Sequence, residues 1–201
     1  MISDDISLSG NRLFPIFLKL DQLHTLIVGG GFVGLEKITG LLKNDPLAKI
    51  TLVAPEIREE IRRHAEKYPN VSLVERKFKS DDLNNVDIAI LATAHRPTNM
   101  EIRKIAKAHG ILTNVADTPD LCDFYLGSTV KKGNLKLGIS TNGMSPTVSK
   151  RLRQLFEEVL PDELDELINN LKTVRDSLKG DFDYKVNRLN EITAGLVNDH
   201  N

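Results

Sequence analysis

The segment LIVGGGFVGLEK, residues 26–37, places four glycines within six positions, between an apolar run and the start of a helical pattern. By itself it fits either a bed for a phosphate group or a tight turn that only needs glycine. Gly29, Gly31 and Gly34 match G-x-G-x-x-G at a strand-to-helix junction, the context that a dinucleotide fingerprint requires. There the first glycine makes the turn, the second lets the backbone approach a pyrophosphate and the third lets helix and strand pack closely. This context favours nucleotide binding.

The chain around this loop alternates between β-branched apolar runs and helical patterns. We predict strands at residues 13–20, 25–30, 49–55, 71–75, 86–92 and 111–115, and helices at residues 34–43, 56–67 and 97–109. Strands separated by helical patterns of this length imply right-handed crossovers. The expected fold class is therefore α/β, a Rossmann-type doubly wound parallel sheet.

A different pattern follows residue 117. The segment FYLGSTVKKGNLKLGIST predicts a β-hairpin outside the parallel sheet, and Ser145-Pro146 is typical of a helix start, with that helix running to about residue 160. Apolar residues then recur at heptad spacing from Leu160 to Leu178, and a last helical pattern follows Gly180. This helical tail either caps its own domain or pairs with a second subunit.

Composition excludes several classes of protein. The 201 residues include 27 basic and 28 acidic side chains, so the chain lacks the one-signed charge of a general nucleic-acid binder. No apolar run approaches the roughly 20 residues that span a bilayer, and the acidic start is unlike a signal peptide. A single cysteine, Cys122, fits a reducing compartment. We expect a cytoplasmic protein that binds neither nucleic acid nor membrane.

The ends of the predicted strands indicate where a cofactor would lie. An NAD site usually has an acidic residue where the second strand ends, but here that strand ends in Ala54-Pro55, with Glu56 only afterwards. Glu56 either reaches the ribose or lies in the first turn of the next helix, so this position does not decide between NAD and NADP. The residues expected to bind the cofactor are Gly29, Gly31, Phe32, Val33, Gly34, Ala54, Pro55, Thr93, Ala94 and Asn99.

The segment after residue 92 has both functional and structural interpretations. Small residues Thr93 and Ala94 leave room for the nicotinamide half of a cofactor. Thr98 fits helix capping as well as cofactor binding. His95 and Arg96 resemble catalytic groups, but an exposed loop pair is the commoner role.

Two further segments carry a family resemblance. NVADTPDLCDFYLGSTV, residues 114–130, and LGISTNGMSP, residues 137–146, closely resemble the siroheme synthase N-terminal family of precorrin-2 dehydrogenases, some of which also insert iron into sirohydrochlorin. The resemblance spans about residues 13–160 and is greatest to the short stand-alone members. It implies an NAD-binding domain at 1–113, a dimerisation and active-site region with a hairpin at 114–145, and a helical domain at 146–201. It also implies a homodimer whose cofactor is NAD and whose substrate is the tetrapyrrole precorrin-2.

The resemblance also implies site residues. Asp117 matches the aspartate most associated with catalysis in the family, where a base would accept the proton released on oxidation. Its alternative role is to cap the loop before Pro119. The substrate's carboxylates need hydrogen-bond donors, and the candidates are Ser140, Thr141, Asn142 and Ser145, of which the last is also a candidate helix cap. Nearby cations at positions 150, 151 and 153 are more typical of a solvated helix face.

This chain departs from the family pattern at two positions, Gly127 and Met144, where relatives commonly have proline and a polar residue. The leading hypothesis is NAD-dependent oxidation of precorrin-2 to sirohydrochlorin in siroheme biosynthesis. A bifunctional dehydrogenase and ferrochelatase is the alternative, although the sequence has no paired metal ligands at recognisable spacing and we expect no metal site. A non-catalytic NAD-sensing module is a remote alternative, since a sensor does not need Asp117 or an anion site.

Overall fold

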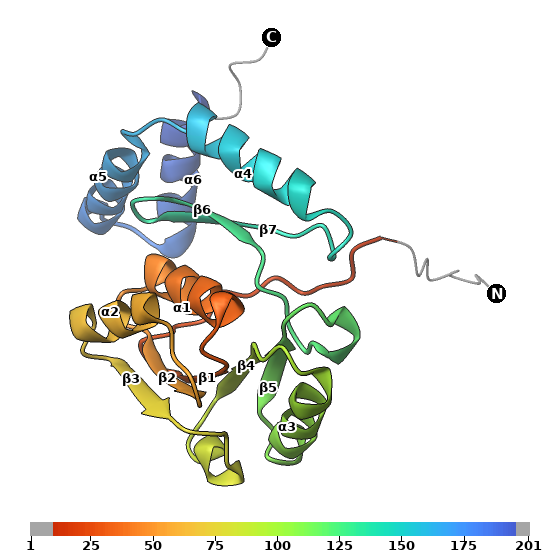
Figure 1. The fold of residues 1–201 in the computed structure, drawn as a ribbon. Helices are drawn as coiled ribbons and strands as arrows, with labels where there is room; N and C mark the ends of the chain where they lie inside the picture. The colour runs from red at the N-terminus through yellow and green to blue at the C-terminus, as the bar shows by residue number, and fades with distance from the viewer. Residues whose placement is uncertain (1–9, 196–201) are drawn as a thin grey trace, which may run out of the picture. The chain divides into compact units, whose positions relative to one another are not determined.

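A computed structural model of the chain describes residues 10–195. Chain contacts divide the described residues into two compact units, residues 10–126 and residues 127–195. Residues 114–126, which we expected to begin a separate region, belong to the first unit. The division into domains at 1–113, 114–145 and 146–201 stays a prediction. Figure 1 shows the elements of both units.

The first unit contains a five-stranded parallel sheet in the order β3-β2-β1-β4-β5, as the alternating pattern predicted. Its strands are β1 (His24–Val28), β2 (Lys49–Ala54), β3 (Val71–Glu75), β4 (Ile88–Leu91) and β5 (Leu112–Val115). Its helices are α1 (Phe32–Asn44), α2 (Glu59–Lys67) and α3 (Arg96–Ala108), with short 3₁₀ turns η1 (Ser80–Leu83) and η2 (Pro119–Leu121). The order reverses between β1 and β4, which makes that junction the topological switch point.

Both faces of the sheet are buried. On one face, Ile27 of β1 packs with Ile38 of α1 and Ile61 of α2. On the other face, Leu26 and Val28 pack with residues of α3. Successive side chains of a strand point to opposite faces, so a continuously apolar strand such as β1 needs helices on both sides. The structure therefore confirms the doubly wound α/β architecture, with α1 and α2 on one face and α3 on the other (Figure 1).

The predicted strand at residues 13–20 is wrong, because residues 11–19 form neither a strand nor a helix. A strand joined to β1 by a short turn would pair next to it, but β1 is hydrogen-bonded to β2 on one side and to β4 on the other. Only the end of the segment joins the core: Leu20 is buried and its carbonyl accepts a hydrogen bond from the Lys49 amide at 3.2 Å. Phe14 and Phe17 are exposed.

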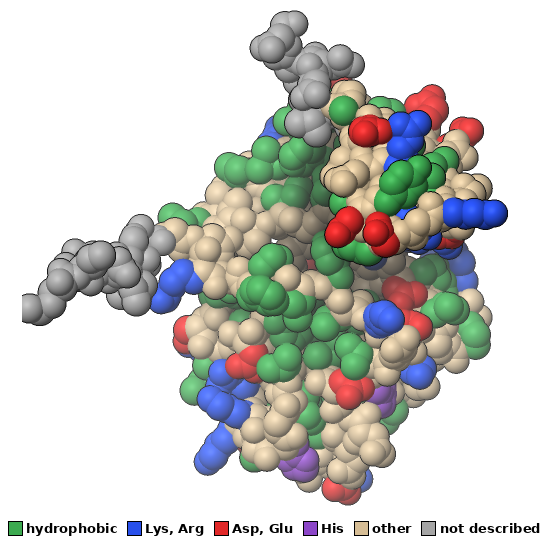
Figure 2. Space-filling model, turned by 180° about the vertical axis from the view of Figure 1, so that it is seen from behind, with side chains coloured by type: hydrophobic (Ala, Val, Ile, Leu, Met, Phe, Trp, Pro, Cys, Tyr) green, Lys and Arg blue, Asp and Glu red, His purple; other side chains and the backbone are tan. Residues whose placement is uncertain are grey.

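The second unit contains the predicted hairpin and helices. Strands β6 (Ser128–Lys132) and β7 (Leu135–Ile139) pair antiparallel, and α4 (Pro146–Val159), α5 (Leu164–Ser177) and α6 (Phe182–Thr193) follow. Ser145 caps α4 by accepting a hydrogen bond from the Val148 amide at 3.2 Å. Among residues 127–195, only Val130 and Ser149 are buried. On the face shown in Figure 2, apolar side chains reach the surface between charged ones of both signs.

Candidate functional site

Four strand ends meet at one edge of the sheet in the first unit. The glycine loop follows β1 and Pro55 follows β2, whereas Thr93 lies two residues after the end of β4 and Asp117 two residues after the end of β5. Because the strands are parallel and adjacent in the order β2-β1-β4-β5, these four segments lie in a row along the carboxyl edge. Ligands of such sheets bind at this edge, at the switch point between β1 and β4. Thus the expected cofactor residues and Asp117 belong to one edge.

Two glycines of the loop are required by the fold itself. Gly29 has a φ of +125°, and a Cβ atom there would collide with the backbone of Ala92 after β4. A Cβ atom at Gly34 would collide with the carbonyl of Gly29. Any side chain at either position would therefore push apart the segments that pack around the loop.

Gly31 differs, because a Cβ atom at that position would meet nothing within 4 Å. Gly31 is also the N-cap of α1, where no side chain caps the helix and no acidic residue lies in the first turn. The first amides of α1 therefore have no side-chain acceptor, and the helix dipole favours an anion beside them. The open space over Gly31 and these amides fit a pyrophosphate group.

The loop between β2 and α2 is attached to the glycine loop. The Arg58 amide donates to the Gly30 carbonyl at 3.1 Å, and a Cβ atom at Gly30 would collide with the Glu56 carbonyl. The Arg58 guanidinium lies 3.7 Å from the centre of the Phe32 ring and donates to the Glu60 carboxylate at 2.8 Å. This hydrogen bond from Arg58 lowers the pKa of Glu60. Sequence analysis missed Arg58, although a cation four residues after a second strand is a signal for a cofactor-facing position.

The position of Glu56 is a correction. The predicted helix at residues 56–67 begins at Glu59, with Arg58 as its N-cap, so Glu56 lies before the helix and not in its first turn. Pro55 bends the chain away from β2, and helical hydrogen bonding starts only after it. Glu56 is exposed, and its carboxylate has no hydrogen bond or ion pair among the described residues. Ala54, by contrast, is buried.

Residues after β4 form a hydrogen-bonded turn. Thr93 donates from its hydroxyl to the Asn99 side-chain oxygen at 2.6 Å, and the Asn99 amide donates to the Thr93 carbonyl at 3.1 Å. Asn99 is buried, so it supports Thr93, whereas Ala94 is exposed. His95 caps α3, since its Nδ1 accepts from the Thr98 amide at 3.3 Å. Arg96 is an exposed residue that pairs with Asp120 at 3.5 Å, so both His95 and Arg96 have structural partners.

Asp117 is an exposed carboxylate without a partner. It has a φ of 54°, a conformation that non-glycine residues adopt rarely and Asp more readily than most. Its side chain makes no hydrogen bond or ion pair among residues 10–195, and η2, which follows it, has no side-chain cap bond. The structure therefore gives no support to the alternative that Asp117 caps this loop.

The loop that carries Asp117 is fixed by the residues on either side. Asp123 accepts hydrogen bonds from the Thr113 amide and hydroxyl, both at 2.9 Å, and Asn114 donates to the Phe124 carbonyl at 2.9 Å. The Cys122 sulfur accepts from the Val115 amide at 3.2 Å, and burial raises the pKa of its thiol. We call these residues, 113–115 with 122–124, the β5 lock. Their role was missed, because the contacts join positions that the sequence pattern does not pair.

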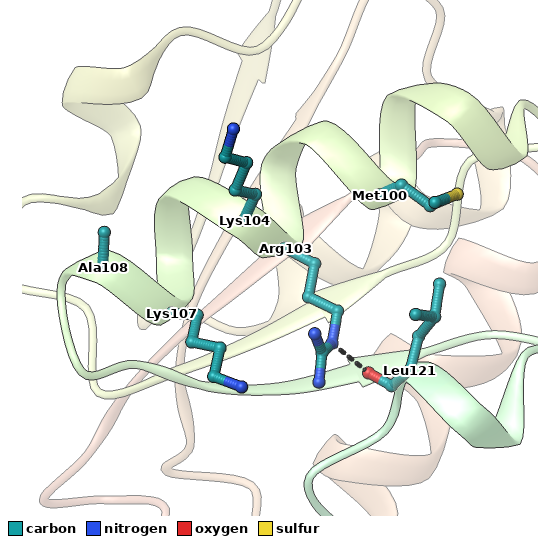
Figure 3. Close-up of a pocket in the computed structure, with 6 residues that line it drawn as sticks. All are labelled: Met100, Arg103, Lys104, Lys107, Ala108 and Leu121. Atoms are coloured by element: carbon teal, nitrogen blue, oxygen red, sulfur yellow. Dashed lines mark hydrogen bonds between the residues drawn. The ribbon is translucent and has the colours of Figure 1, made fainter.

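Arg103 of α3 adds to the β5 lock by donating to the Leu121 carbonyl at 2.6 Å (Figure 3). Its guanidinium also lies 3.4 Å from the Asp123 carboxylate. It also lines a surface hollow of about 380 Å³ with apolar walls. The other residues of this hollow are Met100, Lys104, Lys107, Ala108 and Leu121. The hollow lies along α3 and not at the row of strand ends, so it is separate from the expected cofactor edge.

The predicted anion site in the second unit is a tight turn before α4. The Met144 amide donates to the Thr141 carbonyl at 3.0 Å, and the two central residues, Asn142 and Gly143, have φ values of 54° and 76°. The Thr141 hydroxyl accepts from the Ser145 amide at 3.2 Å and lies 3.2 Å from the Ser149 hydroxyl. The hydroxyls of Thr141 and Ser145 therefore hold the turn and the helix start.

Two other residues of that turn, both exposed, differ in their hydrogen bonding. The Ser140 hydroxyl accepts from the Asn142 amide at 3.1 Å, so it too supports the turn. The Asn142 side chain is exposed and has no partner among the described residues. It is the member of the predicted set whose side chain remains available to a ligand.

The described residues contain neither a candidate metal site nor a candidate membrane span. Within residues 10–195, no group of three or more His, Cys, Asp or Glu side chains is arranged to hold a metal ion. In the same part of the chain, none of the helices has the length and apolar character needed to cross a membrane.

Comparison with known families adds to this geometry. A family model described as "Putative NAD(P)-binding" matches residues 16–128, which is more than half of the chain. The chain belongs to this NAD(P)-binding family. A second model, described as sirohaem biosynthesis protein central, matches residues 132–158, the hairpin turn, β7 and most of α4. The two models together confirm the predicted family resemblance.

Individual relatives agree with the family models. The chain is 34% identical over 177 residues to a siroheme synthase of Pseudoalteromonas translucida and 32% identical over 174 residues to one of Nitrosomonas europaea. These matches cover 88% and 87% of this chain but 37% and 36% of the relatives. Among solved structures, SirC, a precorrin-2 dehydrogenase, is similar with a TM-score of 0.71 and 26% identity, covering 93% of this chain and 90% of SirC.

Proposed function

We propose that this chain oxidises precorrin-2 to sirohydrochlorin with NAD as the acceptor, in siroheme biosynthesis. The observation that carries the proposal is the unpaired carboxylate of Asp117 on the same sheet edge as the glycine loop. The similarity to SirC over nearly the whole of both chains, and to the siroheme synthases over most of this one, supports the choice of substrate.

The reaction removes a hydride and a proton from precorrin-2, so the products are sirohydrochlorin, NADH and one proton. NAD supplies the hydride acceptor when bound. The amides at the start of α1, with the open space over Gly31, would hold its pyrophosphate, and small exposed Ala94 leaves room beside the end of β4. The end of β5 is two strands from β1, about 10 Å away at the usual strand spacing. This position supports a role for Asp117 beside the nicotinamide.

Asp117 would take the proton. The Asp117 carboxylate has no hydrogen bond or ion pair among the described residues, so it is available to a ligand. The β5 lock holds the backbone on both sides of it. We further propose that exposed Asn142 and the turn before α4 bind carboxylates of the tetrapyrrole. Insertion of iron into sirohydrochlorin stays an alternative hypothesis.

We also infer that the protein forms a homodimer through its second unit. Val148, Leu155 and Val159 lie on α4 at spacings of seven and four residues, and all three are about half exposed or more. In α5 and α6 no residue is buried, although both helices are amphipathic. A unit with so few buried side chains gains stability when a second copy covers them.

The test of the catalytic role is the substitution Asp117→Asn. Asn keeps the shape of the side chain and tolerates the left-handed backbone, but it cannot act as a base. In an anaerobic assay of precorrin-2 with NAD, followed by NADH absorbance, we expect kcat to fall by at least about a hundredfold. The dissociation constant for NAD and the melting temperature should not change.

The matched control is Asp120→Asn, which removes an exposed carboxylate from the same loop. It should retain turnover. Undiminished turnover in Asp117→Asn would remove this residue from the mechanism, and absence of precorrin-2 oxidation by the native protein would remove the proposed function.

A further inference from the structure

The outer face of α3 combines a hollow with a positive charge, and the proposed oxidation uses neither. We call it the α3 hollow, and its lining residues are Met100, Arg103, Lys104, Lys107, Ala108 and Leu121. We propose that the α3 hollow is a docking site for a partner protein, which binds there through an acidic segment that contains a large apolar side chain. The inference concerns the first unit alone and does not depend on the proposed function.

Of the six described α-helices, α3 is the most basic. Its 13 residues include four basic side chains and one acidic side chain, which gives a net charge of +3. Each of the other five helices has a net charge between −1 and +1. The whole chain has a net charge of −1. The positive charge on α3 is therefore a local feature and does not follow from the composition of the chain.

Two lysines of the α3 hollow are available to a partner. Lys104 and Lys107 are exposed and make no hydrogen bond or ion pair among residues 10–195. The acidic neighbours of Leu121, at positions 120 and 123, already have partners within the first unit. Figure 3 shows the two lysine side chains extending from α3 in different directions. They can therefore meet carboxylates on either side of a bound apolar side chain.

One end of the α3 hollow is apolar. Met100 is about half exposed, and Leu121 at the end of η2 is partly buried against the core. Figure 3 shows these two side chains at the same end of the hollow. Packing of α3 against the sheet uses Ile102 and Ala106, so the core does not require an apolar residue at position 100. The flexible thioether of Met100 is instead suited to contact with a partner's side chain.

Arg103 holds this surface in place before anything binds. Its guanidinium donates to the Leu121 carbonyl at 2.6 Å, which fixes η2 to α3. The apolar contacts from α3 and from η2 therefore keep their positions relative to each other. A surface that is ordered in advance loses less conformational entropy on binding.

The shape of the α3 hollow favours a protein segment as the occupant. The hollow of about 380 Å³ lies open along one helix, whereas a small-molecule site encloses most of its ligand. A protein segment fills such a hollow with one side chain and covers the rim with its flanking residues. None of the lining residues is aromatic, so nucleic-acid bases would find no stacking surface there. Carboxylates that flank a leucine or phenylalanine match both the lysines and the apolar end.

The experiment measures binding of synthetic peptides to the 201-residue chain by fluorescence anisotropy at low ionic strength. The probe is fluorescein-labelled Glu-Asp-Leu-Phe-Asp-Glu. One comparison peptide replaces Leu-Phe by Ser-Ser, and the other replaces every acidic residue by its amide. We expect the probe to bind at least about fivefold more tightly than either comparison peptide. Amide shifts in NMR spectra of the chain should change mainly in α3 and η2.

Variants of the chain test the two halves of the proposed recognition. Lys104→Gln combined with Lys107→Gln removes both available charges and should weaken probe binding by at least about fivefold. Met100→Gln keeps the length of the side chain but makes it polar, and it should weaken binding by about threefold. The matched control combines Lys43→Gln with Lys49→Gln, which removes two exposed lysines elsewhere in the first unit and should leave binding unchanged. The melting temperature of each variant shows whether it is folded.

Several outcomes would overturn the inference. They are the absence of saturable binding by the probe, an unchanged affinity in the double variant of Lys104 and Lys107, and equal binding of the serine peptide. Tighter binding of a short single-stranded oligonucleotide than of the probe, lost in the same double variant, would assign the hollow to nucleic acid instead. None of these outcomes bears on the oxidation of precorrin-2, so the proposed function is tested separately.

Discussion

Gly29, Gly31 and Gly34 belong to one motif but differ in what surrounds each of them. Gly29 and Gly34 lie against backbone atoms, so they are required for the folded chain whether or not a cofactor binds. Gly31 has a φ of −84° and open space where a Cβ atom would be, so the fold alone does not require glycine there. At the residue scale, two glycines of this six-residue segment are therefore needed for folding, and the third is the one expected to serve binding.

Alanine at Gly31 should therefore mainly weaken NAD binding, whereas alanine at Gly34 should mainly reduce stability. Gly31→Ala should lower the free energy of unfolding by less than about 1 kcal/mol, since alanine is a poorer N-cap than glycine. It should weaken NAD binding by about 1.5–3 kcal/mol, because the added methyl group blocks the approach of the pyrophosphate to the amides. Gly34→Ala should lower the free energy of unfolding by about 1–3 kcal/mol, because its methyl group meets the Gly29 carbonyl. Chemical denaturation and calorimetric titration measure the two quantities.

Gly40→Ala is the control for both, since Gly40 lies inside α1 with nothing within 4 Å of an added Cβ atom. It should raise stability by about 0.5–1 kcal/mol and leave NAD binding unchanged. Normal NAD affinity in Gly31→Ala would contradict the assignment of this loop to the pyrophosphate.

At the scale of elements, the segment after β5 depends on a few hydrogen bonds to keep Asp117 in place. A single oxygen of Asp123 accepts from both the amide and the hydroxyl of Thr113, and Thr113 is fully buried. Loss of that acceptor would leave two buried donors unsatisfied. The loop is thus held through its chain ends and not through Asp117 itself.

We predict that Asp123→Ala lowers the free energy of unfolding by about 1–3 kcal/mol, whereas Asp123→Asn costs less than about 1 kcal/mol. The asparagine oxygen still accepts both hydrogen bonds, and only the 3.4 Å pair with Arg103 loses its charge. Urea denaturation measures the two free energies, and hydrogen exchange at the Thr113 amide reports the local opening. Equal destabilisation by both variants would show that the charge of Asp123, and not its hydrogen bonding, fixes the loop.

The short element η1 predicts a dependence of stability on pH. Two hydrogen bonds from the Arg76 guanidinium, at 2.8 and 2.5 Å, together with one from the Lys79 amide, hold the pKa of Asp82 below its usual value. The folded state therefore favours the ionised carboxylate. Its contribution to stability is present above the unfolded pKa of about 3.9 and is lost as the pH falls through the lower folded pKa.

Asp82→Asn should accordingly be less stable than the native protein at pH 7, and the difference should shrink as the pH falls from about 5 to about 2. Unfolding free energies measured at several pH values test this. Asp81→Asn, an exposed neighbour, should show no such convergence. A constant difference between Asp82→Asn and the native protein over this range would contradict the role assigned to the carboxylate.

At the scale of the whole molecule, the two units differ in how much of their apolar surface they bury. The first unit has a core on each face of its sheet, whereas in the second unit only Val130 and Ser149 are buried among residues 127–195. Unpaired amphipathic helices of this kind are a common basis for association. This contrast is the reason for our proposal that a homodimer forms through the second unit.

Leu155→Glu should therefore shift the protein from dimer to monomer in light scattering, because it places a charge on the exposed apolar face of α4. The first unit should stay folded and bind NAD. Lys150→Gln is the control, since it changes the net charge by the same amount at another exposed position of α4. A native protein that is monomeric at all concentrations, or a Leu155→Glu variant that stays dimeric, would contradict the assignment.

The sequence by itself determined the doubly wound parallel sheet, the glycine loop, the hairpin and the Ser145 cap. Each of these depends on local periodicity or on residues within a few positions of one another, and the comparisons then confirmed the family. Asp117 came only from the family resemblance, and its catalytic role remains a prediction. Local pattern failed at residues 13–20, because an apolar run does not show whether a neighbouring strand already has two partners.

Only the tertiary structure decided which predicted site residues are hydrogen-bonded within the protein and which are exposed and available to a ligand. Asn99 and Thr141 are bonded within the protein, whereas Asp117 and Asn142 are exposed without partners. It also revealed the β5 lock, and it revealed the contact of Arg58 with Phe32, which joins residues 26 positions apart. Hydrogen bonds and ring contacts of this kind depend on distances in space, and those distances are set by the packing of the whole sheet and its helices, not by the order of residues along the chain.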